Sequence, residues 1–130
     1  MKKTALLALL LAGSLSIVSC KKESSESFGK PEATTEAQNP VDLGKEIFTG
    51  KGACVACHKP DVKLVGPSLQ DIAKIYKEKN GDMVSFLKGE GEALVDPAQY
   101  QIMKPNFTLL KTFSEEELKA LEAYMYSHLK

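Results

Sequence analysis

Apolar residues recur at intervals of three and four along several stretches of the chain, the spacing that lines one face of an α-helix. The first stretch begins near Val41, with Asp42 as a candidate N-cap. Gly50 and Gly52 end it. Its apolar positions are Leu43, Ile47 and Phe48. We therefore predict a helix that leads the chain into the segment after Gly52.

Two more helices are predicted in the middle of the chain. One follows a turn at Gly66-Pro67 and closes at Asn80-Gly81, and a shorter one spans about residues 82–88. The apolar faces consist of Leu69, Ile72, Ala73 and Tyr76 in the longer helix and of Met83, Phe86 and Leu87 in the shorter one.

Residues 89–110 show no helical period and predict a long irregular stretch. It opens with two glycines, at 89 and 91, and contains Pro97 and Pro105. Loops of this length inside a small domain are uncommon unless they are functional. We expect this one to cover one face of a ligand.

The last helix has the clearest start signal. Ser114 and Glu117 form a capping box, and the acids at the start of this helix suit its positive N-terminus. The apolar stripe consists of Leu118, Leu121, Met125 and Leu129. Because no stretch requires a strand, the fold class predicted is all-α.

The N-terminus has the layout of a secretory signal. Residues 1–19 begin with two lysines and continue through an apolar run that is too short for a comfortable membrane span. The run ends in Ile17-Val18-Ser19-Cys20, which resembles the bacterial lipobox and implies lipidation of Cys20. An ordinary cleaved signal with a chance cysteine is the alternative.

Residues 20–40 predict a lipidated cysteine followed by a disordered tether. The segment is rich in Ser, Glu, Thr, Lys and Pro, and Phe28 is its one large apolar residue. Such a composition cannot bury enough surface to offset the entropy of ordering. The globular domain is therefore assigned to residues 41–130.

The stretch Cys54-Val55-Ala56-Cys57-His58 contains the candidate cofactor-binding residues. Cys-x-x-Cys-His is the arrangement that bonds a c-type haem through two cysteines, and the histidine can supply one axial nitrogen to the iron. A closed zinc site needs four Cys or His ligands, and elsewhere the chain has only Cys20 and His128. A thioredoxin-like pair would lie near a βαβ pattern, which the sequence lacks.

The sixth iron ligand decides between electron transfer and chemistry on a small molecule. Met83 and Met125 lie on apolar helix faces and are expected to fill the core. His128 is expected to be solvated in the last helical turn. Met103 lies in the long stretch, 45 residues after His58 and close to Pro105, and is the favoured candidate. A thioether opposite an imidazole raises the potential and suits a one-electron carrier.

With these residues in place, the chain resembles a class I cytochrome c in its short bacterial monohaem form. The matching stretches are KGACVACHKPDVKLVGPSLQDIA, the Met103-Lys104-Pro105-Asn106 segment and FSEEELKALEAYM. The resemblance covers residues 41–130 and implies the cytochrome c fold, with three to five helices wrapped around one covalent haem c.

The resemblance also implies residue roles. It implies thioether bonds at Cys54 and Cys57, axial ligation by His58 and Met103, a hydrogen bond from His58 to the Pro67 carbonyl, and orientation of the thioether by Asn106. The first and last helices should cross where Gly44 and Phe48 meet Leu121 and Tyr124. Lys104 stands where a second proline is common, and residues 90–101 have no clear counterpart in the family.

Charge is unevenly distributed in a chain with 17 basic and 17 acidic side chains. The segments 50–65 and 103–111 contain five lysines and one acid, Asp61, so a mildly positive docking face could steer toward an acidic redox protein. An ordinary mixed surface is the alternative. Arg is absent and no basic-aromatic patch occurs, which argues against nucleic acid as a partner.

The sequence therefore predicts an exported electron-transfer protein and not an enzyme. We expect a lipoprotein on the periplasmic side of the bacterial cell envelope, carrying single electrons between respiratory redox partners such as a membrane oxidoreductase or a terminal oxidase or reductase. Two alternatives stay open: a haem enzyme or sensor with an open sixth site, and a fixed electron-entry module of a larger complex.

Overall fold

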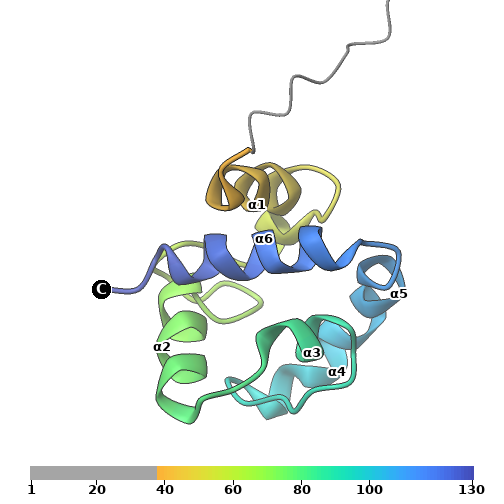
Figure 1. Cartoon of the computed structure of the whole chain (residues 1–130). Helices are drawn as coiled ribbons and strands as arrows, with labels where there is room; N and C mark the ends of the chain where they lie inside the picture. The colour runs from red at the N-terminus through yellow and green to blue at the C-terminus, as the bar shows by residue number, and fades with distance from the viewer. Residues whose placement is uncertain (1–37) are drawn as a thin grey trace, which may run out of the picture. The chain divides into compact units, whose positions relative to one another are not determined.

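The computed structural model describes residues 38–130, a part of the chain that is helical and contains no β-strand. Figure 1 shows α6 running through the middle of this domain, with α1 lying across one side of it. The helices are α1 (Pro40–Thr49), α2 (Leu69–Lys79), α3 (Met83–Leu87), α4 (Tyr100–Met103), α5 (Phe107–Leu110) and α6 (Glu115–Tyr126), with 3₁₀ turns at Cys54–Ala56, Pro97–Gln99 and Lys104–Asn106. The all-α prediction is confirmed.

The predicted signal peptide, Cys20 and the tether up to residue 37 lie outside the described residues. Within residues 38–130, no helix has both the length and the apolar character needed to cross a membrane. The first helix begins at Pro40, one residue before the predicted start of the domain.

Helix α1 is capped by Asn39, so the prediction of Asp42 as its N-cap is wrong. The Asn39 Oδ1 accepts a hydrogen bond from the Val41 N–H at 2.9 Å. Pro40 occupies the first helical position, where its missing N–H is not needed and its fixed φ favours the helix. Asp42 instead lies in the first turn, where its charge suits the positive end of the helix dipole.

The crossing of α1 and α6 depends on a glycine. A Cβ at Gly44 would lie 1.9 Å from the carbonyl oxygen of Ala120, so no larger residue fits without separating the helices. One turn later, the rings of Phe48 and Tyr124 pack with their centroids 5.3 Å apart. Leu121 is fully buried beside them. The helix crossing expected from the sequence is therefore present.

Helices α2 and α3 begin and end where the sequence predicts, whereas α6 ends at Tyr126, so that His128 and Leu129, which were expected within it, lie beyond its end. Ser68 caps α2 and Asp82 caps α3, each by accepting a backbone N–H three residues later. Asn80 ends α2 with a φ of 50°, the left-handed conformation that asparagine tolerates better than most residues. The capping box of Ser114 and Glu117 at the start of α6 is complete.

Residues 89–110 are only partly irregular, which corrects the prediction for their second half. From Pro97 onward the chain forms consecutive short turns of 3₁₀ and α-helix that end at Leu110. Pro97 and Pro105 each stand at the start of one of these turns, where proline initiates a helical turn rather than breaking it. Met103 is thus the last residue of α4 rather than a loop residue.

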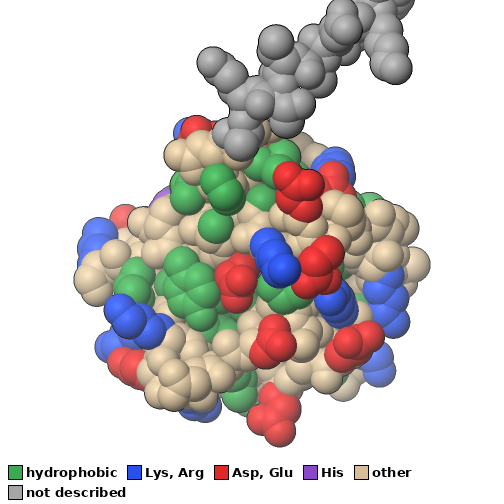
Figure 2. Space-filling view, in the orientation of Figure 1, with side chains coloured by type: hydrophobic (Ala, Val, Ile, Leu, Met, Phe, Trp, Pro, Cys, Tyr) green, Lys and Arg blue, Asp and Glu red, His purple; other side chains and the backbone are tan. Residues whose placement is uncertain are grey.

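Acidic and basic side chains are interspersed over the face that carries α3 and α6 (Figure 2). Lys88 at the end of α3 pairs with Glu115 at the start of α6, and Lys119 lies 3.5 Å from the same carboxylate. These pairs are exposed, so each contributes little to stability. This face has no strong charge of one sign.

Candidate functional site

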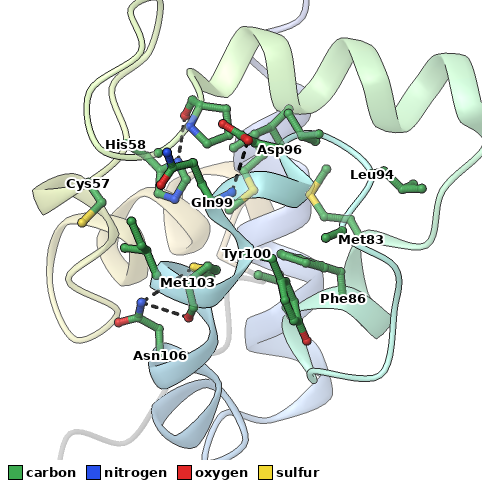
Figure 3. A pocket seen from close by; sticks show the side chains of 18 of the residues that line it. Cys57, His58, Met83, Phe86, Leu94, Asp96, Gln99, Tyr100, Met103 and Asn106 are labelled. Atoms are coloured by element: carbon green, nitrogen blue, oxygen red, sulfur yellow. Dashed lines mark hydrogen bonds between the residues drawn. The ribbon is translucent and has the colours of Figure 1, made fainter.

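A large cavity lies between the segment that follows α1 and the segment that contains α4. It encloses about 770 Å³ not filled by protein atoms, part of it open to solvent. Most of its lining is apolar and comes from several helices (Figure 3). Deeply placed lining residues are Ile72, Met83, Leu87 and Met125.

His58 enters this cavity with a fixed ring orientation. Its Nδ1 lies 2.8 Å from the carbonyl oxygen of Pro67, the hydrogen bond expected from the sequence (Figure 3). Because a carbonyl oxygen only accepts, Nδ1 carries the proton and Nε2 keeps its lone pair. The ring can therefore offer Nε2 to a metal while the Pro67 carbonyl holds it from behind.

Gly66 is a site residue that the sequence analysis interpreted only as part of a turn. A Cβ at this position would lie 2.4 Å from Cε1 of His58 and within 2.9 Å of both ring nitrogens. The imidazole thus occupies the space that any other side chain would need. The glycine before Pro67 was the available signal, but its meaning depends on where the ring of His58 lies.

The two cysteines lie on a short 3₁₀ turn that begins at Cys54. Ala53 precedes it with a φ of 50°, and the N–H of His58 donates to the Cys54 carbonyl at 2.9 Å. Both thiols are free, and Cys57 lines the cavity. The turn therefore holds the cysteines and the imidazole in one compact unit.

Thiol redox chemistry and zinc binding both fit this unit poorly. Burial raises the pKa of the Cys54 thiol to about 11, whereas a reactive thiol pair needs a lowered pKa. Within residues 38–130, no group of three or more Cys, His, Asp or Glu side chains could hold a metal ion. The cysteines are better suited to bonding an organic cofactor.

Met103 lines the cavity from α4, on a different wall from His58 (Figure 3). Asn106 Nδ2 donates to the Met103 carbonyl at 3.1 Å and lies 3.8 Å from its sulfur. The amide can therefore restrain the thioether. The structure thus brings to one cavity all the ring, thioether and amide groups that the resemblance implied.

The remaining candidates for the sixth ligand are two methionines of the hydrophobic core and a histidine outside the cavity. Met83 and Met125 are 1% and 6% exposed and belong to the core, as expected, while also lining the cavity. His128 does not line it. Its ring packs edge-on against Tyr124, and its Nε2 is buried without a partner among the described residues, so the expectation of a solvated imidazole is wrong.

Two of the five lysines in segments 50–65 and 103–111 form ion pairs within the domain. Lys51 pairs with Glu117 and lies over the Phe113 ring, and Lys63 pairs with Asp96 at 2.7 Å. The other three have no ion pair within residues 38–130 and are Lys59, Lys104 and Lys111. Exposed apolar side chains in the same segments are Val62, Leu64, Val65 and Leu109, and Ile102 lies one residue before Met103.

The fold and the site together define a c-type haem protein. The cavity is apolar, as a porphyrin ring requires, and Cys57, His58 and Met103 line it. Cys54 does not line it but begins the 3₁₀ turn that Cys57 ends. These residues fit a haem held through cysteines and two axial ligands.

Comparison with known proteins supports this class. Residues 41–128 match the cytochrome c family. The chain is similar to cytochrome c-552 of Nitrosomonas europaea, with 37% identity over 86 residues, which cover 65% of this chain and 74% of that protein. Cytochrome c-551 of Azotobacter vinelandii is 33% identical over 88 residues, covering 67% of this chain and 99% of that protein.

A third relative, cytochrome c-551 of Pseudomonas denitrificans, is 50% identical over 44 residues, or 34% of this chain and 51% of that protein. The chain belongs to the cytochrome c family, and the family match implies one covalently attached haem c. It is an electron-transfer monohaem cytochrome.

We expect Gly66→Ala to displace the ring of His58, because the new methyl group would overlap it. Overpacking of this kind costs about 1–3 kcal/mol when the neighbours cannot move. The purified variant should show a lower yield of haem-loaded protein and an altered visible spectrum. Val62→Ala, which removes an exposed side chain from the same loop but outside the cavity lining, should leave both unchanged.

Proposed function

We propose that Cys54 and Cys57 bond the haem and that His58 and Met103 supply its axial ligands. The observation that carries this proposal is the presence of His58 Nε2 and the Met103 thioether on two walls of one apolar cavity. Pro67 would hold the imidazole and Asn106 the thioether. When bound in this way, haem iron supplies a one-electron couple between its ferric and ferrous states.

The residues of the chain would keep this couple confined to electron transfer. The Met103 thioether, if it held the iron, would occupy the place that oxygen or peroxide would need. The apolar lining around Met103 favours the less charged ferrous site and limits the entry of water. Both effects support a carrier rather than a haem enzyme or sensor.

Met103→Ala tests the ligand assignment directly. The wild-type ferric protein should show the weak far-red absorption of a sulfur-to-iron bond, and the variant should lose it. Its reduction potential should fall by on the order of 0.1 V, within the range of about 0.8 V that axial ligands set. Met125→Leu is the matched control and should keep the far-red absorption, because leucine preserves an apolar side chain of similar volume at this core and cavity-lining position.

A wild-type protein that is already high-spin and lacks the far-red band would contradict the carrier proposal. In that case the sixth site is open, and a haem enzyme or sensor becomes the better interpretation.

The proposal extends to location. We infer that the protein is exported, lipidated at Cys20, and held on the periplasmic side of the bacterial envelope by residues 20–40. The apolar run and the Ile17-Val18-Ser19-Cys20 sequence support this inference. The tether would let the domain reach redox proteins at the membrane surface.

Cys20→Ser should move the protein out of the membrane fraction or leave its signal uncleaved. Fractionation of cells and mass spectrometry of the N-terminus measure the two outcomes. A variant that remains in the membrane fraction with a normally processed N-terminus would show that Cys20 is not the attachment point. Ser19→Ala is the control, because it keeps a small residue before the cysteine.

We further propose that the partner presents an acidic rim around an apolar patch. Lys59 and Lys104 lie in the segments that carry His58 and Met103, and neither has an ion pair within residues 38–130. The exposed side chains of Leu64 and Ile102 would provide the apolar contact. The lysines would attract the acidic partner, and the apolar side chains would then lose their water as the two surfaces come into contact.

Lys59→Glu and Lys104→Glu should each slow electron transfer to an acidic partner several-fold at low salt and much less at high salt, because salt screens exposed charges. Stopped-flow mixing at two ionic strengths measures the rates. Lys74→Glu changes the charge equally but lies on α2, outside the two segments, and should have a smaller effect. Equal slowing at both ionic strengths would rule out steering.

A further inference from the structure

The two walls that carry His58 and Met103 are joined by one polar contact. Among the hydrogen bonds and ion pairs of residues 38–130, only the contact between Lys63 and Asp96 links the segment 53–67 to the segment 93–106. The Lys63 Nζ lies 2.7 Å from Asp96 Oδ2. The pair thus connects the loop after His58 to the stretch that leads into Met103.

The second carboxylate oxygen of Asp96 accepts a hydrogen bond from within the segment 93–106. Its Oδ1 accepts a hydrogen bond from the N–H of Gln99 at 3.3 Å and so caps the 3₁₀ turn Pro97–Gln99 (Figure 3). Helix α4 follows without a break and ends at Met103. We call residues 97–103 the helical arm. The Asp96 carboxylate therefore caps the start of this arm and also binds Lys63 in the segment that carries His58.

The rest of the arm is held mainly by aromatic packing. Tyr100 packs against Phe86 and Phe107, with ring centroids 6.3 and 5.9 Å away. These contacts fix the side of α4 that faces α3 and α5. They do not tie the arm to the segment that carries His58.

The Lys63–Asp96 pair is formed in the charged state. The Lys63 ammonium holds the pKa of the Asp96 carboxyl below its usual range, so the carboxylate is ionised at neutral pH. The lysine is more than half exposed, and its partner is one-fifth exposed. An ion pair with this exposure contributes little free energy and is screened by salt, so changes in ionic strength alter its strength.

We propose that Asp96 is a positioning residue for Met103 and that its ion pair with Lys63 keeps the helical arm against the His58 wall. The proposal rests on the function proposed above, in which Met103 is an axial ligand. Breaking the pair loosens the arm and increases the fraction of molecules whose thioether has left the iron. A competing ligand then binds more easily, because its apparent affinity rises with that fraction.

Imidazole binding to the ferric holoprotein measures this fraction. At pH 8 imidazole is mostly neutral, so a change in surface charge has little effect on its binding. Lys63→Met and Asp96→Asn should each raise the apparent affinity for imidazole about twofold to fivefold, the range that an exposed ion pair supports. Loss of the far-red absorption during the titration reports the displacement of Met103.

The variants separate the ion pair from the cap. Asparagine still caps a helical turn, so Asp96→Asn removes the charge and keeps the cap. Lys63→Arg preserves the pair and should bind imidazole as the wild type does. The double variant Lys63→Met/Asp96→Asn should show no more than the larger single effect, because both changes remove one interaction.

Lys88→Met is the matched control. It breaks the exposed pair with Glu115, which joins α3 to α6 rather than the two walls of the site, and should leave imidazole binding unchanged. High salt should bring the wild type toward the Lys63→Met variant and change the variant less.

Two results would overturn the inference: wild-type imidazole affinity in both Lys63→Met and Asp96→Asn, or an effect of the Asp96 change alone. The second would mean that the Asp96 carboxylate acts independently of Lys63. Failure of the axial-ligand proposal has a different signature. In that case Met103→Ala itself would bind imidazole no better than the wild type, and the far-red band would be missing from the start.

Discussion

The hydrogen bond between His58 and the Pro67 carbonyl is the contact on which the site depends. It fixes the tautomer of the ring, and with it the nitrogen that faces the cavity. It also accounts for the glycine before Pro67. The chain returns to the imidazole within nine residues, and only a residue without a side chain fits beside the ring at position 66. The sharp loop from 59 to 66 follows from this requirement, and α2 begins at Leu69, after Pro67 and the capping Ser68.

The cavity is at the same time part of the hydrophobic core. Met83, Leu87 and Met125 pack with other core side chains and also line the space between the walls. A haem in this position would complete the apolar interior of a domain that is small for an independent core. Binding of the cofactor and folding are therefore expected to be coupled, since a ligand held only by the native state stabilises that state.

Local signals in the sequence predicted much of this architecture, and contacts between distant residues limited the rest. The Cys-x-x-Cys-His stretch and the Ser114 capping box are contiguous, so their geometry could be predicted. Pro97 was misinterpreted because proline disrupts the interior of a helix but is favoured at its first position. The proline alone does not show which of these positions it occupies. The pairing of Lys63 with Asp96 could not be predicted, because it joins residues 33 positions apart.

The crossing of α1 and α6 has a mechanical consequence. Any tension that reaches the domain from its N-terminal side enters at Asn39 and passes along α1 before it reaches the cysteines. That helix is locked to α6 at Gly44, where the backbones touch, and by the rings of Phe48 and Tyr124. A pull on the chain would therefore act on this helix pair before it reached the residues that face the cavity.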